Sequence, residues 1–178
     1  MSNKKESKNE QKQYPSTDLL LNLCINEYQK ETQRTSSIDT KTNIFLTLST
    51  ALYAFFIPLS DLKNVYAIEY SIKNSVVALM ITFLVITSFI SLLTATIIFI
   101  SVISSRKYKA IDVHSLLKYA DKEREKTSVV MCRLYDTAVL FNRQLNEKRM
   151  KLFKTGVISI LFCIVLTTVA YILKVNFI

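Results

Sequence analysis

The residue types that most often carry out chemistry are scarce in this chain and lie far apart. His114 is the only histidine, and Cys24, Cys132 and Cys163 lack the paired spacing of a zinc site or of a CxxC redox motif. Gly156 is the only glycine, so a GxGxxG or Walker-type phosphate loop is impossible. No Ser-His-Asp or Cys-His pattern is present either. We therefore predict no catalytic residues, no metal, no cofactor and no enzymatic activity, and we interpret the cysteines as packing residues that form no disulfide.

One set of hydroxyl side chains has the spacing of a helix face. At about 100° per residue its members fall within roughly 40° of Thr87 on either side. The set comprises Thr87, Ser91, Thr94, Ser101 and Ser105. Small hydroxylic residues let neighbouring helices approach closely, so this stripe is consistent with helix packing. The alternative is a stripe that lines a water-filled pathway in an oligomer.

Eight basic residues lie next to the ends of two long apolar blocks: three follow the block 74–105, and five precede the block 155–173. The set comprises Arg106, Lys107, Lys109, Arg143, Lys148, Arg149, Lys151 and Lys154. Contact with anionic lipid headgroups, at about 1 kcal/mol for each residue, would account for these charges. A phosphate-bearing ligand is the alternative.

The apolar residues that must position these side chains are gathered into three blocks without a formal charge, at 42–60, 74–105 and 155–173. A helix of about 19 residues, the length of the first and third blocks, spans roughly 28 Å at about 1.5 Å per residue, close to the roughly 30 Å of hydrocarbon in a bilayer, and the middle block is longer than a span requires. Backbone amides in lipid must pair within their own segment, which makes each block helical. We predict an all-α integral membrane protein with three transmembrane helices, at 42–60, 76–103 and 155–173, and a cytoplasmic helical unit.

The distribution of lysine and arginine predicts the orientation. Of 23 basic residues, thirteen lie in 104–154 and seven in 1–41. Positively charged segments stay on the cytoplasmic side, so we expect a cytoplasmic N-terminus, an external loop at 61–75 and an external C-terminus. This asymmetry accounts for most of the formal charge of +9. We therefore expect no binding to nucleic-acid duplexes.

The remaining segments are polar or amphipathic. Residues 1–15 have the composition of a disordered arm. Residues 16–41 are predicted to form a cytoplasmic helix that begins at the capping residues Ser16, Thr17 and Asp18. In the expected cytoplasmic region 104–153, residues 106–153 contain no proline or glycine that would interrupt a helix. We expect one hairpin or one bent pair of helices there, with a turn near Asp121–Lys126.

Part of this cytoplasmic region has the spacing of a helix seam. Val130, Leu134, Thr137 and Phe141 are separated alternately by four and three residues. Such spacing is typical of a helix that packs against another helix. The partner is either the N-terminal helix or another subunit of a homo-oligomer.

Two short patterns resemble a known family. Glu31-x-x-Arg34-x-x-x-Ile38-Asp39-x-Lys41 resembles the juxtamembrane signature of small bacterial anti-phage effectors, the Pycsar-type transmembrane effectors and SLATT-domain proteins. Asn142-x-x-x-Asn146-Glu147-Lys148 is similar to the far end of the same architecture.

The resemblance implies an effector of the bacterial inner membrane that senses a cyclic nucleotide or oligonucleotide, oligomerises and permeabilises or depolarises the bilayer. The alternative is a non-conducting scaffold or immunity partner that docks another protein through helices in 106–153.

Overall fold

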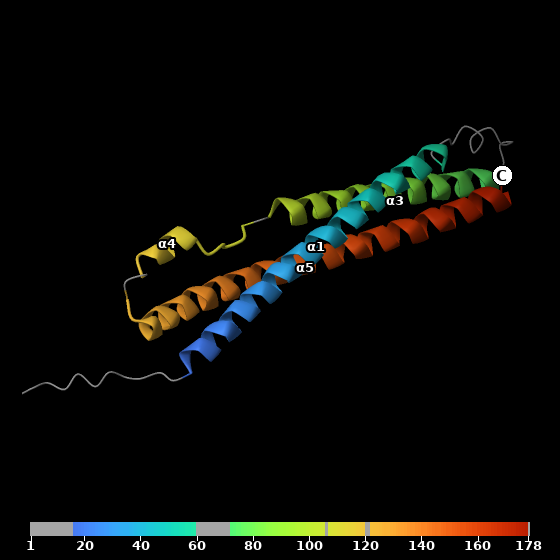
Figure 1. The fold of residues 1–178 in the computed structure, drawn as a ribbon. Coiled ribbons are helices and arrows are strands. Elements are labelled where there is room, and N and C mark those ends of the chain that lie inside the picture. The colour runs from blue at the N-terminus through green and yellow to red at the C-terminus, as the bar shows by residue number, and fades with distance from the viewer. Residues whose placement is uncertain (1–15, 60–71, 106, 120–121, 178) are drawn as a thin grey trace, which may run out of the picture. The chain divides into compact units, whose positions relative to one another are not determined.

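The computed structural model describes residues 16–59, 72–105, 107–119 and 122–177. Every regular element in these ranges is an α-helix: α1 (Thr17–Leu59), α3 (Ile72–Ser104), α4 (Val113–Leu117) and α5 (Arg124–Phe177), as Figure 1 shows. The chain divides into unit 1, which ends at Thr32 and resumes over Lys109–Arg143, and unit 2, which comprises Gln33–Tyr108 and Gln144–Ile178. The boundary therefore falls within both α1 and α5.

Unit 2 is a bundle of three helices. Asp39 of α1 contacts Arg149 of α5, and further along both helices Phe45 contacts Phe153. Because the residue numbers increase in the same direction on both helices, the two segments run parallel. The α3 helix runs antiparallel to both. Its contacts with α5 run in opposite senses, since Ser91 bonds Ser159 whereas Val102 bonds Arg149.

The centre of this bundle is filled by aromatic rings. Phe99 of α3 lies 5.8 Å from Phe45 of α1 and 5.9 Å from Phe153 of α5, measured between ring centroids. Gly156 of α5 faces the same ring, because a Cβ atom at this position would lie 2.7 Å from Phe99 Cε1. A residue without a side chain thus lets the α3 ring sit against the α5 backbone, as small residues do between transmembrane helices.

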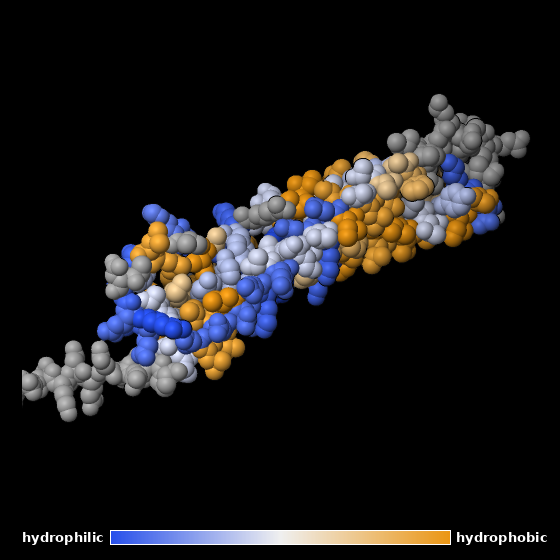
Figure 2. Space-filling view, viewed as in Figure 1, coloured by the Kyte–Doolittle hydropathy of each residue, from blue (hydrophilic) through white to orange (hydrophobic). Residues whose placement is uncertain are grey.

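Much of the apolar surface of unit 2 faces outwards. Two described helices, rather than the expected three, are long and apolar enough to cross a membrane, over Ser75–Ser104 and Arg124–Asn176. Only 22 % of the most apolar window of each is buried, which differs from the largely buried core helix of a soluble protein. Figure 2 shows the apolar surface spread over α3 and the C-terminal part of α5. Membrane association follows from this exposure.

The expected first span, 42–60, lies in α1, and Ser60 and the side chains after Phe56 lie outside the described residues. The described part of that stretch mixes apolar residues with the polar residues Thr42, Asn43, Thr47, Ser49 and Thr50. The hydroxyl groups among them donate to the carbonyl four residues earlier, as Thr42 does to Ile38 at 2.7 Å and Ser49 to Phe45 at 2.9 Å. This bonding satisfies polar groups within an apolar setting.

Unit 1 pairs the first part of α1 with the first part of α5. Asp18 accepts a hydrogen bond from Arg124 at 2.9 Å, and Tyr28 packs edge-on against Tyr135 at 5.5 Å between centroids. The two segments therefore run parallel. The predicted disordered arm, 1–15, and the external-loop residues 60–71 lie outside the described residues.

The region 104–153, where one hairpin or one bent pair of helices is expected, contains the short α4 and the first part of α5, which begins at Arg124 within the expected turn. Only the stretch before α4 differs from the expected helices. Residues 107–112 are not helical, and α4 has only five residues, with Asp112 as its N-cap. The buried side chain of Asn142 explains the difference, because it accepts from the Lys109 N–H at 2.9 Å and donates to the Lys109 carbonyl at 3.2 Å. Both backbone groups of Lys109 are thereby satisfied outside a helix.

Candidate functional site

The most buried charge in unit 2 belongs to Arg149 of α5, whose side chain is 1 % exposed. Its Nε donates to the Val102 carbonyl at 3.0 Å, and its Nη2 is paired with the Asp39 carboxylate. Nη1 is buried without a hydrogen-bond partner among the described residues. One guanidinium thus joins all three helices of the bundle near the C-terminal end of α3.

Polar side chains on α5 continue this buried line. Asn146 is fully buried, and its Oδ1 accepts from the Thr35 hydroxyl of α1 at 3.0 Å. Buried polar groups of this kind specify one alignment of neighbouring helices, because any other alignment would leave them unpaired. Asn146 and Arg149 therefore fix the register of α1 against α5 in unit 2.

Unit 1 contains a half-buried arginine, Arg143 of α5, which also pairs with carboxylates of α1. It donates from Nη2 to Glu27 at 3.2 Å and from Nε to the buried carboxylate of Glu31 at 3.3 Å. Glu27 also pairs with Lys30 at 2.7 Å. The hydrogen bond and charge of Lys30, followed by the charge of Arg143, lower the pKa of Glu27.

The juxtamembrane motif residues thus have different surroundings. Glu31 and Asp39 are the partners of arginines on α5, whereas Lys41 is exposed and Arg34 is half-buried. Glu31 and Asp39 therefore join α1 to α5. The motif spacing singles out these carboxylates but not their partners, which lie about 110 positions away in the sequence.

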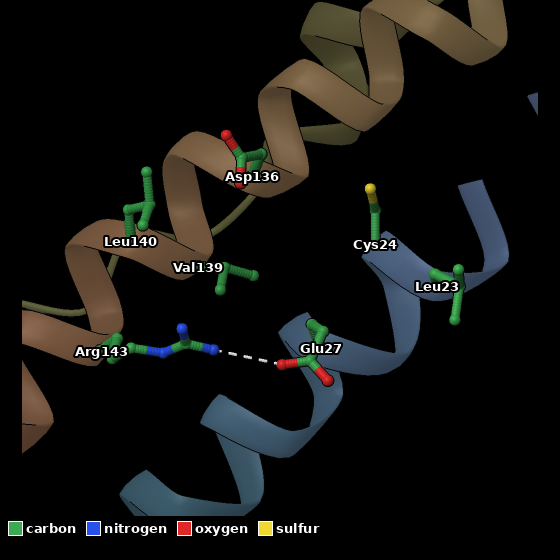
Figure 3. A pocket seen from close by; sticks show the side chains of 7 residues that line it. All are labelled: Leu23, Cys24, Glu27, Asp136, Val139, Leu140 and Arg143. Atoms are coloured by element: carbon green, nitrogen blue, oxygen red, sulfur yellow. Dashed lines mark hydrogen bonds and ion pairs between the residues drawn. The ribbon is translucent and has the colours of Figure 1, made fainter. Parts of the chain in front are cut away.

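A cavity of about 270 Å³ lies beside Arg143 in unit 1. Figure 3 shows Cys24 and Glu27 on α1 facing Val139 and Arg143 on α5, with the Arg143–Glu27 ion pair across the gap. The full lining comprises Leu23, Cys24, Glu27, Asp136, Val139, Leu140 and Arg143. Its walls are mainly apolar and carry two carboxylates and one guanidinium.

The expectation that the cysteines form no disulfide is wrong for one pair. Cys24 and Cys132 are joined, with their Cα atoms 5.7 Å apart and 108 positions of sequence between them. That separation lies in the range of disulfides. The parallel pairing of α1 with α5 creates this proximity, and no local sequence pattern reports it. Cys163 is a buried free thiol, as expected of a packing residue.

The basic set is divided by the structure. Arg143 and Arg149 are engaged with carboxylates inside the fold, so the buried Arg149 is not a contact for lipid phosphate. The remaining members whose placement is described are exposed: Lys107, Lys109, Lys148, Lys151 and Lys154. Arg106 lies outside the described residues. Contact of the exposed lysines with phosphate groups stays a prediction.

The hydroxyl stripe is also divided. Ser91 donates across the bundle to the Ser159 carbonyl of α5 at 2.9 Å, which is a packing contact. The other four donate to carbonyls of α3 itself, three or four residues earlier: Thr87, Thr94, Ser101 and Ser105. Thr94 and Ser101 are exposed on α3. A pathway between subunits along them stays a prediction.

The predicted seam is not the face through which α5 packs in unit 1. Leu134, Thr137 and Phe141 are exposed, and Val130 is half-buried. The buried line is displaced by one residue and comprises Ala138, Asn142, Asn146, Arg149, Phe153, Gly156, Ile160 and Cys163. Its spacings of four and three residues are present in the sequence, but the polar residues among its members hid the pattern of a core face. Pairing of subunits through the predicted seam stays a prediction.

Among the described residues, no group of three or more His, Cys, Asp or Glu side chains could hold a metal ion. Comparisons with protein-family models, with curated proteins and with solved structures found no match to this chain.

Proposed function

We propose that this chain is a three-span effector of the bacterial inner membrane, activated through unit 1 to oligomerise and permeabilise or depolarise the bilayer. The outward-facing apolar surface of unit 2 carries the membrane part of the proposal. Large apolar side chains are exposed on all three helices, including Ile44 and Phe55 of α1, Phe83 of α3 and Ile158 of α5. In water such a surface would drive aggregation, whereas in lipid it is the stable arrangement.

The pairing within unit 1 supports a third span in α1. Residues Asp18 and Arg124 are bonded to each other, so both lie on one side of the membrane. If α3 crosses the bilayer, its first residue lies on the side opposite to its last residue. The chain must then also cross between Thr32 and Ile72, and α1 is the described helix that covers most of this stretch.

The charge distribution supports the orientation. Unit 1 includes most of the lysines and arginines of the 104–154 region, and the positive-inside rule places such a segment in the cytoplasm. The C-terminus is then external. We propose a cyclic nucleotide or oligonucleotide as the activating ligand, as the resemblance of the juxtamembrane motif implies.

Any permeation pathway would lie between copies of the chain. The centre of the bundle is occupied by Phe45, Phe99 and Phe153, and Phe99 is fully buried. A ring of α3 helices from several copies would instead place exposed hydroxyls such as Thr94 and Ser101 along a shared path. The proposed homo-oligomer is therefore needed for function.

A second candidate is a non-conducting scaffold that docks a protein through unit 1. The observation in its favour is a set of exposed apolar residues in this polar unit: Leu19, Leu20, Leu23, Leu134, Leu140 and Phe141. Such residues are typical of protein interfaces.

Leakage from vesicles separates the two candidates. Purified chain would be reconstituted into vesicles that contain a potassium gradient and a potential-sensitive dye. After addition of cyclic nucleotides and short oligonucleotides, tested one at a time, an effector should depolarise these vesicles with at least one of them and a scaffold should depolarise them with none. Thr94→Val removes a hydroxyl from the proposed path and should reduce ion flux. Thr168→Val is the matched control, because Thr168 is also exposed and also donates to its own helix, to Ile164 at 2.8 Å. No depolarisation by the wild-type oligomer with any of these nucleotides would reject the nucleotide-activated effector.

A further inference from the structure

The Cys24–Cys132 pair connects α1 to α5 in the unit that the basic residues assign to the cytoplasm. Disulfides in a bacterial cytoplasm are reduced unless they are transient and regulatory. A permanent structural disulfide is therefore inconsistent with the proposed orientation, whereas a reversible one is not. From this geometry we propose that Cys24 and Cys132 form a peroxide-responsive modification site that cross-links the two helices of unit 1. The proposal depends on the cytoplasmic placement of unit 1.

The fold holds the two sulfur atoms ready for reaction. The Cα atoms lie 5.7 Å apart on parallel helices. Tyr28 with Tyr135 and Asp18 with Arg124 hold the same helices on either side of the pair. Formation of the bond therefore needs little rearrangement of the backbone. Both cysteines are half-buried, so neither is sealed inside a core.

The residues that line the cavity indicate which cysteine is oxidised first. Their charges indicate which class of oxidant can enter. Cys24 lines the cavity of about 270 Å³, and Cys132 does not. Glu27 and Asp136 lie in the same wall, while Arg143 is already paired with carboxylates. This lining disfavours anionic oxidants such as glutathione disulfide. A small neutral hydroperoxide can approach without this repulsion.

The reaction balances with hydrogen peroxide as the oxidant. The Cys24 thiolate attacks one oxygen, the O–O bond breaks, and the hydroxide that leaves takes up the thiol proton to form water. The resulting Cys24 sulfenic acid is attacked by the Cys132 thiolate. The S–O bond then breaks, and a second water forms with the Cys132 proton. Two thiols thus reduce one peroxide to two waters, and a cytoplasmic dithiol reverses the bond by exchange.

Mass spectrometry of the full chain in lipid nanodiscs tests this chemistry. After treatment with hydrogen peroxide, the wild-type chain should lose two hydrogen atoms and yield a Cys24–Cys132 linked peptide. With dimedone present, Cys132→Ser should gain one adduct on Cys24, whereas Cys24→Ser should gain less on Cys132. Cys163→Ser is the matched control and should behave as the wild type, because Cys163 is a buried free thiol of unit 2. No linked peptide, or trapping only on Cys132, would overturn the proposal.

Acid-quenched cells tagged with a thiol-reactive polymer test the switch in its setting. Three tags are expected at rest and one after a peroxide pulse, with recovery of three tags afterwards. One tag at rest would identify a permanent disulfide and would overturn both the switch and the cytoplasmic placement. Three tags after the pulse would overturn the switch alone. The tag count does not depend on leakage, so a failure of the proposed permeabilisation would leave it unchanged.

Discussion

At the scale of single residues, Arg149 has the largest effect that the structure predicts on stability. Its buried guanidinium pairs with Asp39, whose side chain is 21 % exposed, so removal of either residue leaves the other charge without this ion pair. We expect Arg149→Met to cost about 3 kcal/mol. Replacement of both residues, as Arg149→Met with Asp39→Leu, should be less damaging than Arg149→Met alone, because neither charge then remains without the ion pair.

Denaturant titration in mixed micelles measures this difference. Lys148→Met is the matched control, since Lys148 is the exposed neighbour of Arg149 and should change the free energy of unfolding little. A double variant less stable than either single variant would contradict the account of Arg149 as a paired buried charge.

Gly156 tests the packing of the aromatic centre. In Gly156→Ala the new Cβ would lie 2.7 Å from Phe99 Cε1, and the fully buried ring has little room to move. Overpacking of this kind should cost about 1–3 kcal/mol. Thr155→Ala changes an exposed neighbour and serves as the control.

A smaller ring should relieve that clash. Phe99→Leu combined with Gly156→Ala should lose less stability than the sum of the two single losses. The free energy of unfolding in micelles measures the coupling. Additive losses would show that Phe99 and Gly156 are not in the predicted contact.

Glu27 links the stability of unit 1 to pH. Its pKa is lowered from the ordinary value of 4.5 by Lys30 and Arg143, so the folded state favours the carboxylate. The stabilisation is present above 4.5 and is lost as the pH falls through the lowered pKa. The melting temperature of the wild type should exceed that of Glu27→Gln at neutral pH, and this difference should disappear in acid. A difference that grows in acid would contradict the assignment.

At the scale of elements, the exposed seam of α5 predicts how copies associate. Leu134 and Phe141 are exposed on unit 1 and do not serve its internal packing. Leu134→Asp with Phe141→Asp should therefore leave the monomer folded and weaken an oligomer formed through this face. Size-exclusion chromatography in mild detergent measures the assembly. Thr137→Asp alone, between them on the same face, should have a smaller effect, because it removes less apolar area.

The apolar helices could be predicted from the sequence better than the region 104–153. Long uncharged blocks leave a helix as the only structure with satisfied amides, which is why 76–103 and 155–173 lie within α3 and α5. The segment after α3 could not be predicted in this way. Its conformation depends on Asn142 capturing the backbone of Lys109, a contact between residues 33 positions apart. The seam was displaced for a related reason, since Asn146 and Arg149 are polar residues at core positions.

At the scale of the whole molecule, the residues of the candidate site could be identified from the sequence, but the pairs that they form could not. Glu31 and Asp39 could be singled out as motif residues, whereas their pairing with Arg143 and Arg149 required the parallel alignment of α1 with α5. The same alignment brings Cys24 to Cys132. Long-range proximity of this kind leaves no periodic pattern in a single sequence.

The central claim is that the chain crosses the membrane three times with unit 1 in the cytoplasm. Measuring on which side of the membrane unit 1 lies tests it most directly. Single cysteines would be introduced at Asn64, Lys122 and Asn176 of a chain whose three natural cysteines are replaced by serine, and spheroplasts would be treated with a thiol reagent that cannot cross membranes. Three crossings with unit 1 inside predict labelling at Asn64 and Asn176 in intact spheroplasts, and labelling at Lys122 only after lysis. Labelling of Lys122 in intact spheroplasts, or protection of Asn64, would contradict the account.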